Sequence, residues 1–99
     1  MTIRQMQNKE RLTIALEGRL DSIAAKQLEE TVALEGVTEL ELDLTLLSYI
    51  SSAGLRVVLN AQKQMNAKNG TMAVRNVNGL NMEIFESVGF TDFLTIVNE

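Results

Sequence analysis

Residues 39–67 read ELELDLTLLSYISSAGLRVVLNAQKQMNA and contain a strand pattern followed by a helix pattern. Its first residues alternate between leucine and an acidic residue, which is the period-two pattern of a strand with one buried face. We therefore predict a central strand over residues 38–44, followed by a short connection that carries Tyr49. From residue 55 to residue 67 the apolar positions recur at helical spacing. The stretch thus predicts a buried strand that leads through two serines and a glycine into a helix.

The residues before this stretch predict a β-hairpin and a first helix. Period-two alternation over Arg11–Leu16, after a turn at residues 8–10, favours a hairpin within the first seventeen residues. Asp21 or Ser22 is well placed to cap a helix that ends near Gly36. The apolar stripe expected on this helix consists of Ile23, Ala24, Ala25, Leu28, Val32 and Leu34.

The residues after the stretch predict a further strand, a third helix and a last strand. We place them at residues 71–77, at residues 79–88 and at Phe93–Val97. Helical spacing assigns to the core Leu80, Ile84, Phe85 and Val88, and the phenylalanines expected to seal it are Phe85, Phe90 and Phe93. The order β-β-α-β-α-β-α-β indicates one α/β domain over residues 1–99, with a mixed sheet of about five strands packed by three to four helices.

The composition excludes several classes of function. The 99 residues include neither cysteine nor histidine, so an ordinary zinc site and Ser-His-Asp or Cys-His catalysis are not expected. We expect no metal and no cofactor. A formal net charge of −4 argues against a nucleic-acid partner, because Lys and Arg supply most of the affinity for phosphate backbones.

The hydropathy pattern favours a cytoplasmic protein without a membrane partner. No stretch approaches the roughly 18 consecutive apolar residues that a membrane-spanning helix requires. Residues 1–10 also lack the apolar segment of a secretory signal.

The corner at residues 51–54, SSAG, is the strongest candidate for a functional site. A helix N-terminus offers unpaired N–H groups and the positive end of the helix dipole, so this corner suits an anion. It could bind a phosphate, or it could present a serine whose phosphorylation creates the anion in place. The simpler alternative is that Ser51 or Ser52 caps the helix, and capping is compatible with switching.

Three motifs resemble the STAS domain of bacterial anti-sigma factor antagonists. The first is GRLD at residues 18–21, together with Ala25 and Leu28. The second is LDL at residues 42–44 followed by YISSAGLRVVL at residues 49–59, and the third is the closing segment from Ile84 to Ile96. The resemblance covers roughly residues 10–97, with the motifs in the order of the family.

The resemblance implies a regulatory role for the corner. In the family the phosphorylated residue lies two positions before the motif glycine, which assigns it to Ser52, with Ser51 as the second candidate. The unphosphorylated protein would bind an anti-sigma factor that is also a serine kinase, and a PP2C-type phosphatase would reverse the phosphorylation. The domain would be a substrate and a ligand, not an enzyme. The chain departs from the family at Ser51, where aspartate is frequent, and at Ala53, where serine or threonine is frequent.

The expected partner-binding surface surrounds the corner and belongs to a monomer or weak dimer. It consists of Asp21, Ser51, Ser52, Ala53, Gly54, Leu55, Arg56 and Leu59. Two alternatives stay open within it: Asp21 as a simple helix cap, and Leu55 and Leu59 as fillers between helices.

Two other functions compete with this interpretation. A STAS scaffold subunit of another complex, such as a stress-signalling assembly or a lipid-transport accessory protein, would share the same fold. A small phosphate-binding enzyme is the alternative from a different class. The chain lacks the glycine-rich phosphate loop with its lysine, histidine, and paired carboxylates at catalytic spacing, all of which argues against an enzyme.

Overall fold

The computed structural model describes residues 1–92 and 94–98, and it confirms the predicted order of strands and helices. The elements are β1 (Thr2–Asn8), β2 (Arg11–Leu20), α1 (Ser22–Thr31), β3 (Glu39–Ile50), α2 (Ser52–Ala67), β4 (Thr71–Arg75), α3 (Gly79–Ser87), the 3₁₀ turn η1 (Phe90–Asp92) and β5 (Thr95–Val97). The predicted start of the last strand at Phe93, and the packing of that ring, lie outside the described residues.

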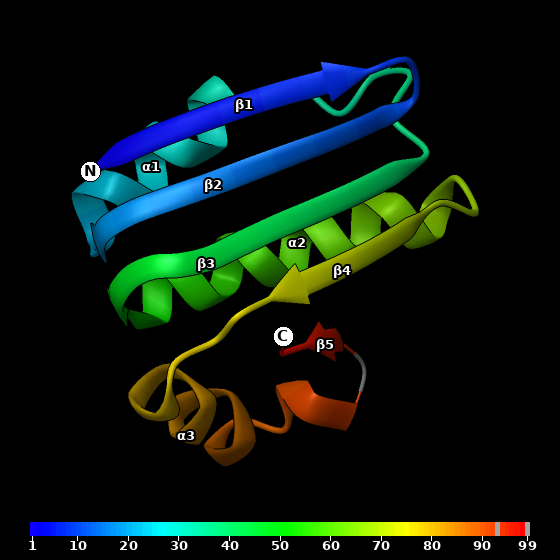
Figure 1. Ribbon diagram of the computed structural model, residues 1–99. Helices are drawn as coiled ribbons and strands as arrows, with labels where there is room; N and C mark the ends of the chain where they lie inside the picture. The colour runs from blue at the N-terminus through cyan, green and yellow to red at the C-terminus, as the bar shows by residue number, and fades with distance from the viewer. Residues whose placement is uncertain (93, 99) are drawn as a thin grey trace.

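The five strands form one mixed sheet in the order β1-β2-β3-β4-β5. β1 pairs with β2 in an antiparallel hairpin, and the other three pairs are parallel. Helices α1 and α2 lie side by side on one face of the sheet, while neither covers the face turned to the viewer in Figure 1. The domain is therefore a layer of helices on a sheet whose second face is polar, as described below.

Alternate residues of the two central strands build the core beneath these helices. The side chains that point to the helix layer are 3% exposed or less on both strands: Leu12, Ile14 and Leu16 of β2, and Leu40, Leu42 and Leu44 of β3. Complete burial of a leucine or isoleucine stabilises a fold by about 1.5–3 kcal/mol. These positions therefore fix which face of each strand turns inward, since a slip of one residue would expose all six.

The central strand is longer than predicted, because two bulges let it keep pairing with β2. The register passes from Ala15↔Asp43 to Glu17↔Leu46, which leaves one extra residue in β3. A second extra residue, Ser48, follows, and its hydroxyl donates to the Gly18 carbonyl at 2.9 Å. The predicted end of the strand at residue 44 is thus wrong. Tyr49 lies on β3, which continues to the residue before the serine corner.

Helix α1 is shorter than predicted. It ends at Thr31, and Val32 already has an extended backbone. Gly36 does not end the helix but adopts a left-handed conformation, with φ +74°, in the turn that follows. The chain leaves the helix early because Leu34 and Val37, both buried, reach the core from this loop.

Three apolar residues that helical spacing assigned to the core are exposed. They are Ile23 at 81%, Leu80 at 53% and Val88 at 47%. Helix α1 approaches the sheet through the short side chains Ala24 and Ala25, so only a narrow arc of its surface is covered. Helix α3 turns a polar residue and Phe85 inward instead, and the Phe85 ring packs against Phe90 with centroids 6.0 Å apart.

Candidate functional site

Ser51 is the N-cap of helix α2, and both hydrogen-bonding roles of its hydroxyl are occupied. Its Oγ accepts from the Gly54 N–H at 3.2 Å and donates to the Leu20 carbonyl at 2.8 Å. The Ser51 N–H donates to the same carbonyl at 2.9 Å. Ser51 therefore fastens the end of β2 to the start of α2, and the cap predicted for this corner is this residue.

Ser52 is the first residue of α2 and has a different environment. It is exposed, and its hydroxyl forms no hydrogen bond with any residue that the structure describes. The cap is made by its neighbour, so modification of Ser52 would not remove it. The corner thus combines one serine fixed by packing and hydrogen bonds with one serine open to solvent at the positive end of a helix dipole.

Gly54 allows the first turn of α2 to lie directly against the ends of two strands. A Cβ atom at this position would stand 2.7 Å from Leu20 Cγ and 2.9 Å from Ile50 Cγ1. Both neighbours are buried core side chains with little room to move. The glycine of the predicted motif is therefore required for close packing at this corner.

Asp21 caps helix α1 at the same edge of the sheet. Its Oδ1 accepts from the Ala24 N–H at 2.9 Å, which confirms the capping interpretation. Asp21 follows Leu20, whose carbonyl is held by Ser51. The starts of the two helices are consequently neighbours, and the exposed side chains of Asp21 and Ser52 lie at the same end of the sheet.

The remaining residues of the expected surface differ in their access to solvent. Leu55 is only 8% exposed and belongs to the core, so it does not widen an exposed apolar edge. Leu59 is half-buried and packs against the core, as the filling alternative predicted. Arg56 is exposed, Ala53 is half-buried and Gly54 is buried. A partner could reach the exposed side chains of Asp21, Ser52 and Arg56 directly.

Asn81 of helix α3 holds the end of β3 that leads into the corner, a role that was not predicted from the sequence. The side chain is fully buried, with its Oδ1 accepting from the Ile50 N–H at 3.1 Å and its Nδ2 donating to the Leu47 carbonyl at 3.2 Å. Asn78, the cap of α3, donates to the same Leu47 carbonyl at 3.1 Å. These hydrogen bonds fix the last residues of β3 before Ser51. The signal in the sequence was an asparagine four residues before Phe85, on the inward face of the predicted helix.

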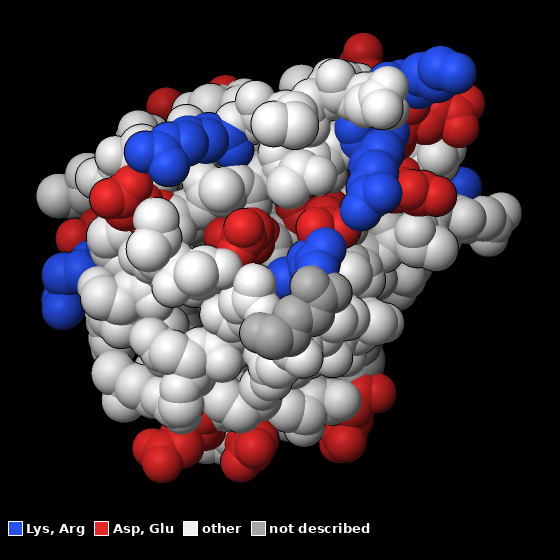
Figure 2. All heavy atoms as spheres, viewed as in Figure 1, with Lys and Arg blue, Asp and Glu red and all other residues white. Residues whose placement is uncertain are grey.

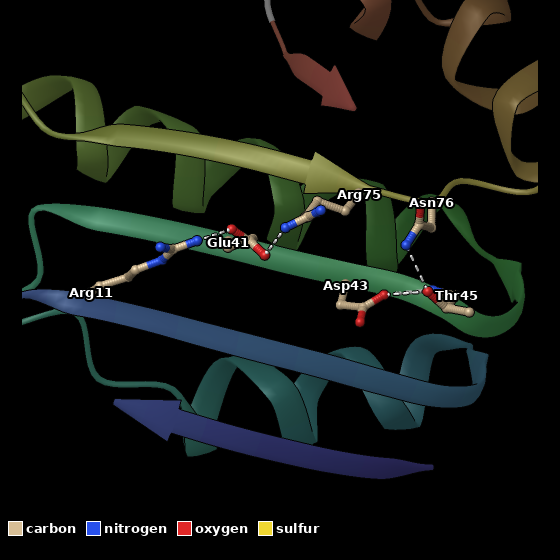
Figure 3. A network of polar contacts seen from close by, with 6 residues as sticks. All are labelled: Arg11, Glu41, Asp43, Thr45, Arg75 and Asn76. Atoms are coloured by element: carbon tan, nitrogen blue, oxygen red, sulfur yellow. Dashed lines mark hydrogen bonds and ion pairs between the residues drawn. The ribbon is translucent and has the colours of Figure 1, made fainter. Parts of the chain in front are cut away.

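The uncovered face of the sheet carries a separate polar network. The Glu41 carboxylate receives hydrogen bonds from Arg11 at 2.7 Å and from Arg75 at 2.9 Å, so it joins three neighbouring strands (Figure 3). Asp43 accepts from the Thr45 hydroxyl at 2.5 Å on the same face. Basic and acidic side chains alternate across this view of the molecule instead of gathering in one basic patch (Figure 2).

The network changes the titration of both carboxylates. Burial would raise the pKa of Glu41, but the hydrogen bonds and charges of Arg11 and Arg75 together outweigh it and lower the pKa. The pKa of Asp43 is also lowered, chiefly by its hydrogen bond from Thr45. Among the described residues no group of three potential ligands could hold a metal ion. The network therefore stabilises the sheet by ion pairing and hydrogen bonding.

Glu41 should make the stability of the fold depend on pH. Its folded pKa lies below the ordinary value of 4.5, so its contribution is complete above about pH 4.5 and is lost as the pH falls through the folded pKa. We expect the free energy of unfolding in urea to fall less steeply below that pH in Glu41→Gln than in the wild type. Glu39→Gln is the matched control, since Glu39 lies on the same strand, opposite Arg11 in the register, but forms an ion pair with neither arginine in the described structure. Parallel pH profiles for the wild type and Glu41→Gln would contradict the assignment.

The fold and the corner define a small α/β module that presents a serine at a helix start, and comparison with known proteins identifies its family. The model of the family described as "Mlab, STAS domain" matches residues 3–97. The chain belongs to the STAS domain family. Among the described residues, no helix has both the length and the apolar character to cross a membrane.

Two curated relatives match most of the chain. The putative anti-sigma factor antagonist BtrV of Bordetella bronchiseptica is 38% identical over 90 residues, which cover 88% of this chain and 78% of BtrV. The anti-sigma-B factor antagonist of Listeria monocytogenes is 28% identical over 90 residues, which cover 88% of this chain and 79% of that protein.

Solved structures share the fold at lower identity. The anti-sigma factor antagonist SpoIIAA in its unphosphorylated form has a TM-score of 0.79 at 21% identity, covering 99% of this chain and 88% of SpoIIAA. The Bacillus cell fate determinant SpoIIAA in its phosphorylated form has a TM-score of 0.77 at 22% identity, with coverage of 96% and 90%. A putative anti-sigma factor antagonist of Thermotoga maritima has a TM-score of 0.89 at 15% identity, with coverage of 98% and 86%.

Proposed function

We propose that this protein is an anti-sigma factor antagonist of a bacterial partner-switching pathway, controlled by phosphorylation of Ser52. The unphosphorylated form binds an anti-sigma factor that is also a serine kinase, and this binding releases a sigma factor. Phosphorylation of Ser52 ends the binding, and a PP2C-type phosphatase restores it. The protein acts in the cytoplasm as a ligand and a substrate, without catalysing a reaction. The names of the relatives and the STAS fold support this proposal.

The observation that carries the proposal is the difference between the two serines of the corner. A kinase must reach the hydroxyl oxygen, and the Ser52 hydroxyl is exposed without a hydrogen-bond partner among the described residues. The Ser51 hydroxyl is half-buried and holds both Leu20 and Gly54. Phosphorylation of Ser51 would break the helix cap, which is worth about 1 kcal/mol. Phosphorylation of Ser52 leaves the cap intact.

The same geometry supports an electrostatic and steric switch. A phosphate adds about −1.5 to −2 charges at neutral pH. On Ser52 it lies beside the first N–H groups of α2, where the helix dipole favours negative charge. The fold therefore accommodates the phosphate with little rearrangement, while a partner surface complementary to a neutral serine meets a bulky anion. The affinity falls because the contact surface changes, not because the domain unfolds.

Mapping the phosphate tests the proposal. A pull-down with this chain identifies the bound kinase, and the purified pair is incubated with ATP before mass spectrometry. We expect one phosphate, on Ser52, and none in Ser52→Ala. Ser51→Ala is the matched control, because it removes the neighbouring hydroxyl and should still be phosphorylated despite its weaker helix cap. Phosphate on Ser51, or on any other residue, would overturn the assignment.

A second candidate is a STAS subunit of a complex outside sigma-factor control. The description of the matching family, which names Mlab beside the STAS domain, favours keeping this alternative. A partner whose binding is the same for wild type, Ser52→Ala and the phosphorylated chain would support the second candidate over the first.

A further inference from the structure

Strand β1 is an open edge of the sheet. It is the first strand in the sheet order and pairs only with β2, so its outward N–H and C=O groups have no strand partner among the described residues. Six of its seven residues are exposed, and the seventh, Ile3, is half-buried. Figure 1 shows β1 as the outermost strand of the sheet, in front of helix α1. An uncovered edge of this kind is a template for a further strand.

Several of the usual protections of an edge strand are missing from β1, and its one charged side chain, Arg4, is paired with Glu17 of β2. Its seven residues contain neither proline nor lysine, and they pair with β2 from Thr2↔Glu17 to Asn8↔Arg11 without a bulge. The opposite edge, β5, has only three residues and is protected by its shortness. β1 is therefore the edge at which the sheet can be extended.

We propose that β1 docks against β1 of a second copy of this chain, in an antiparallel pair about a two-fold axis at Gln5. In this arrangement the two five-stranded sheets become continuous, with the helices of both copies on the same face. The interface is formed by main-chain hydrogen bonds, as in other cases of strand addition. The partner is a second copy because one register of β1 against itself pairs all seven residues without placing like charges opposite each other.

In an antiparallel pair of β1 strands, the helices of both copies lie on the same face of the sheet only when the numbers of two paired residues add up to an even value. This follows because side chains alternate between the two faces along each strand. In the register whose paired numbers add up to ten, all seven residues are paired. This register places Thr2 opposite Asn8, Ile3 opposite Gln7, Arg4 opposite Met6 and Gln5 opposite Gln5. A sum of eight places Arg4 opposite Arg4, which like charge disfavours. A sum of twelve pairs only five residues. The register centred on Gln5 is therefore the favoured one.

The side chains on β1 suit this register. Met6 is 75% exposed in the single copy and would be covered by the aliphatic part of Arg4 from the second copy. The Arg4 charge is already paired with Glu17 at 3.3 Å within its own chain. The formal charge of −4 on each copy opposes association, so the dimer should become tighter as added salt screens this repulsion.

Sedimentation velocity over a concentration series tests the docking edge. We expect the wild type to pass from monomer to dimer with rising concentration and to do so more readily at higher salt. Gln5→Lys should weaken the dimer roughly fivefold or more, because the two introduced ammonium groups face each other at the axis. Gln7→Lys is the matched control, since its partner would be Ile3, and it should change the dimer constant less than about twofold. Circular dichroism confirms that both variants are folded.

Single-cysteine variants test the register independently, because the wild type has no cysteine. Under oxidation, Gln5→Cys should form a disulfide-linked dimer. Gln7→Cys should not, since the two thiols would be four residues apart along the strands, about 13 Å. A wild type that stays monomeric at every concentration would overturn the proposal. Equal weakening by both lysine variants, or equal cross-linking of both cysteine variants, would overturn it as well.

Discussion

Ser52→Asp should bind the anti-sigma factor at least roughly thirtyfold more weakly than the wild type. A carboxylate at this position introduces an unpaired charge into the contact surface, and such a charge costs about 2–5 kcal/mol when it is buried in an interface. The fold itself should keep or slightly gain stability, because an acidic residue in the first turn of α2 is favoured by the helix dipole. Isothermal titration calorimetry with the purified partner measures the affinity, and urea unfolding measures the stability.

Ser52→Asn is the matched control for this experiment. Asparagine has nearly the same size and shape as aspartate but carries no charge, so the difference between the two variants isolates the electrostatic part of the switch. We expect Ser52→Asn to retain most of the affinity. Equal losses in both variants would mean that the switch depends on bulk alone, and equal binding by Ser52→Asp and the wild type would contradict a role for this position in the interface.

Asn81→Leu should lower the free energy of unfolding by about 2–3 kcal/mol. The substitution keeps the branched outline of the side chain, with bulkier methyl groups, but removes the acceptor of the hydrogen bond that the buried Ile50 N–H donates. A buried backbone donor left without a partner costs about 1–3 kcal/mol. The Leu47 carbonyl keeps its bond from Asn78, so the loss is concentrated at the residue before Ser51. A domain of this size is typically stable by only about 5–15 kcal/mol, so the effect is large.

The control for this substitution is Asn60→Leu on helix α2. Asn60 is exposed, and the same chemical change there should alter the stability by no more than about 0.5 kcal/mol. Urea unfolding followed by circular dichroism compares the two variants with the wild type. An Asn81→Leu protein as stable as Asn60→Leu would show that the buried amide is not needed to hold the end of β3.

The order of the elements and the position of the serine corner were predictable because they depend on local patterns. Alternation of leucine and acidic residues in β3, and helical spacing in α2, each follow from burial of one face. A cap made by one of the two serines, Ser51 or Ser52, follows from the preference of serine for helix starts. The full length of β3 was not predictable, since its bulges depend on pairing with β2, which is distant in sequence.

The identity of the inward residues on the helices was also only partly predictable. Spacing places Phe85 in the core but cannot tell whether the sheet covers enough of α3 to bury Leu80 as well. The burial of Asn81 depends on backbone groups of β3, and these need a partner only once the strand passes beneath α3. Similarly, the choice between Ser51 and Ser52 as the cap became clear only from the structure, in which the Gly54 N–H donates to Ser51 Oγ.

The two hydrogen bonds from Ser51 to the Leu20 carbonyl also affect the entropy of partner binding. Because the N–H and the hydroxyl of one residue hold the same oxygen, the two helix starts are fixed to the sheet before any partner arrives. Ordering a loop on binding would consume part of the interaction free energy. Here the surface around Ser52 is already in place, so a partner meets a preorganised site whose affinity depends on the chemical state of one exposed hydroxyl.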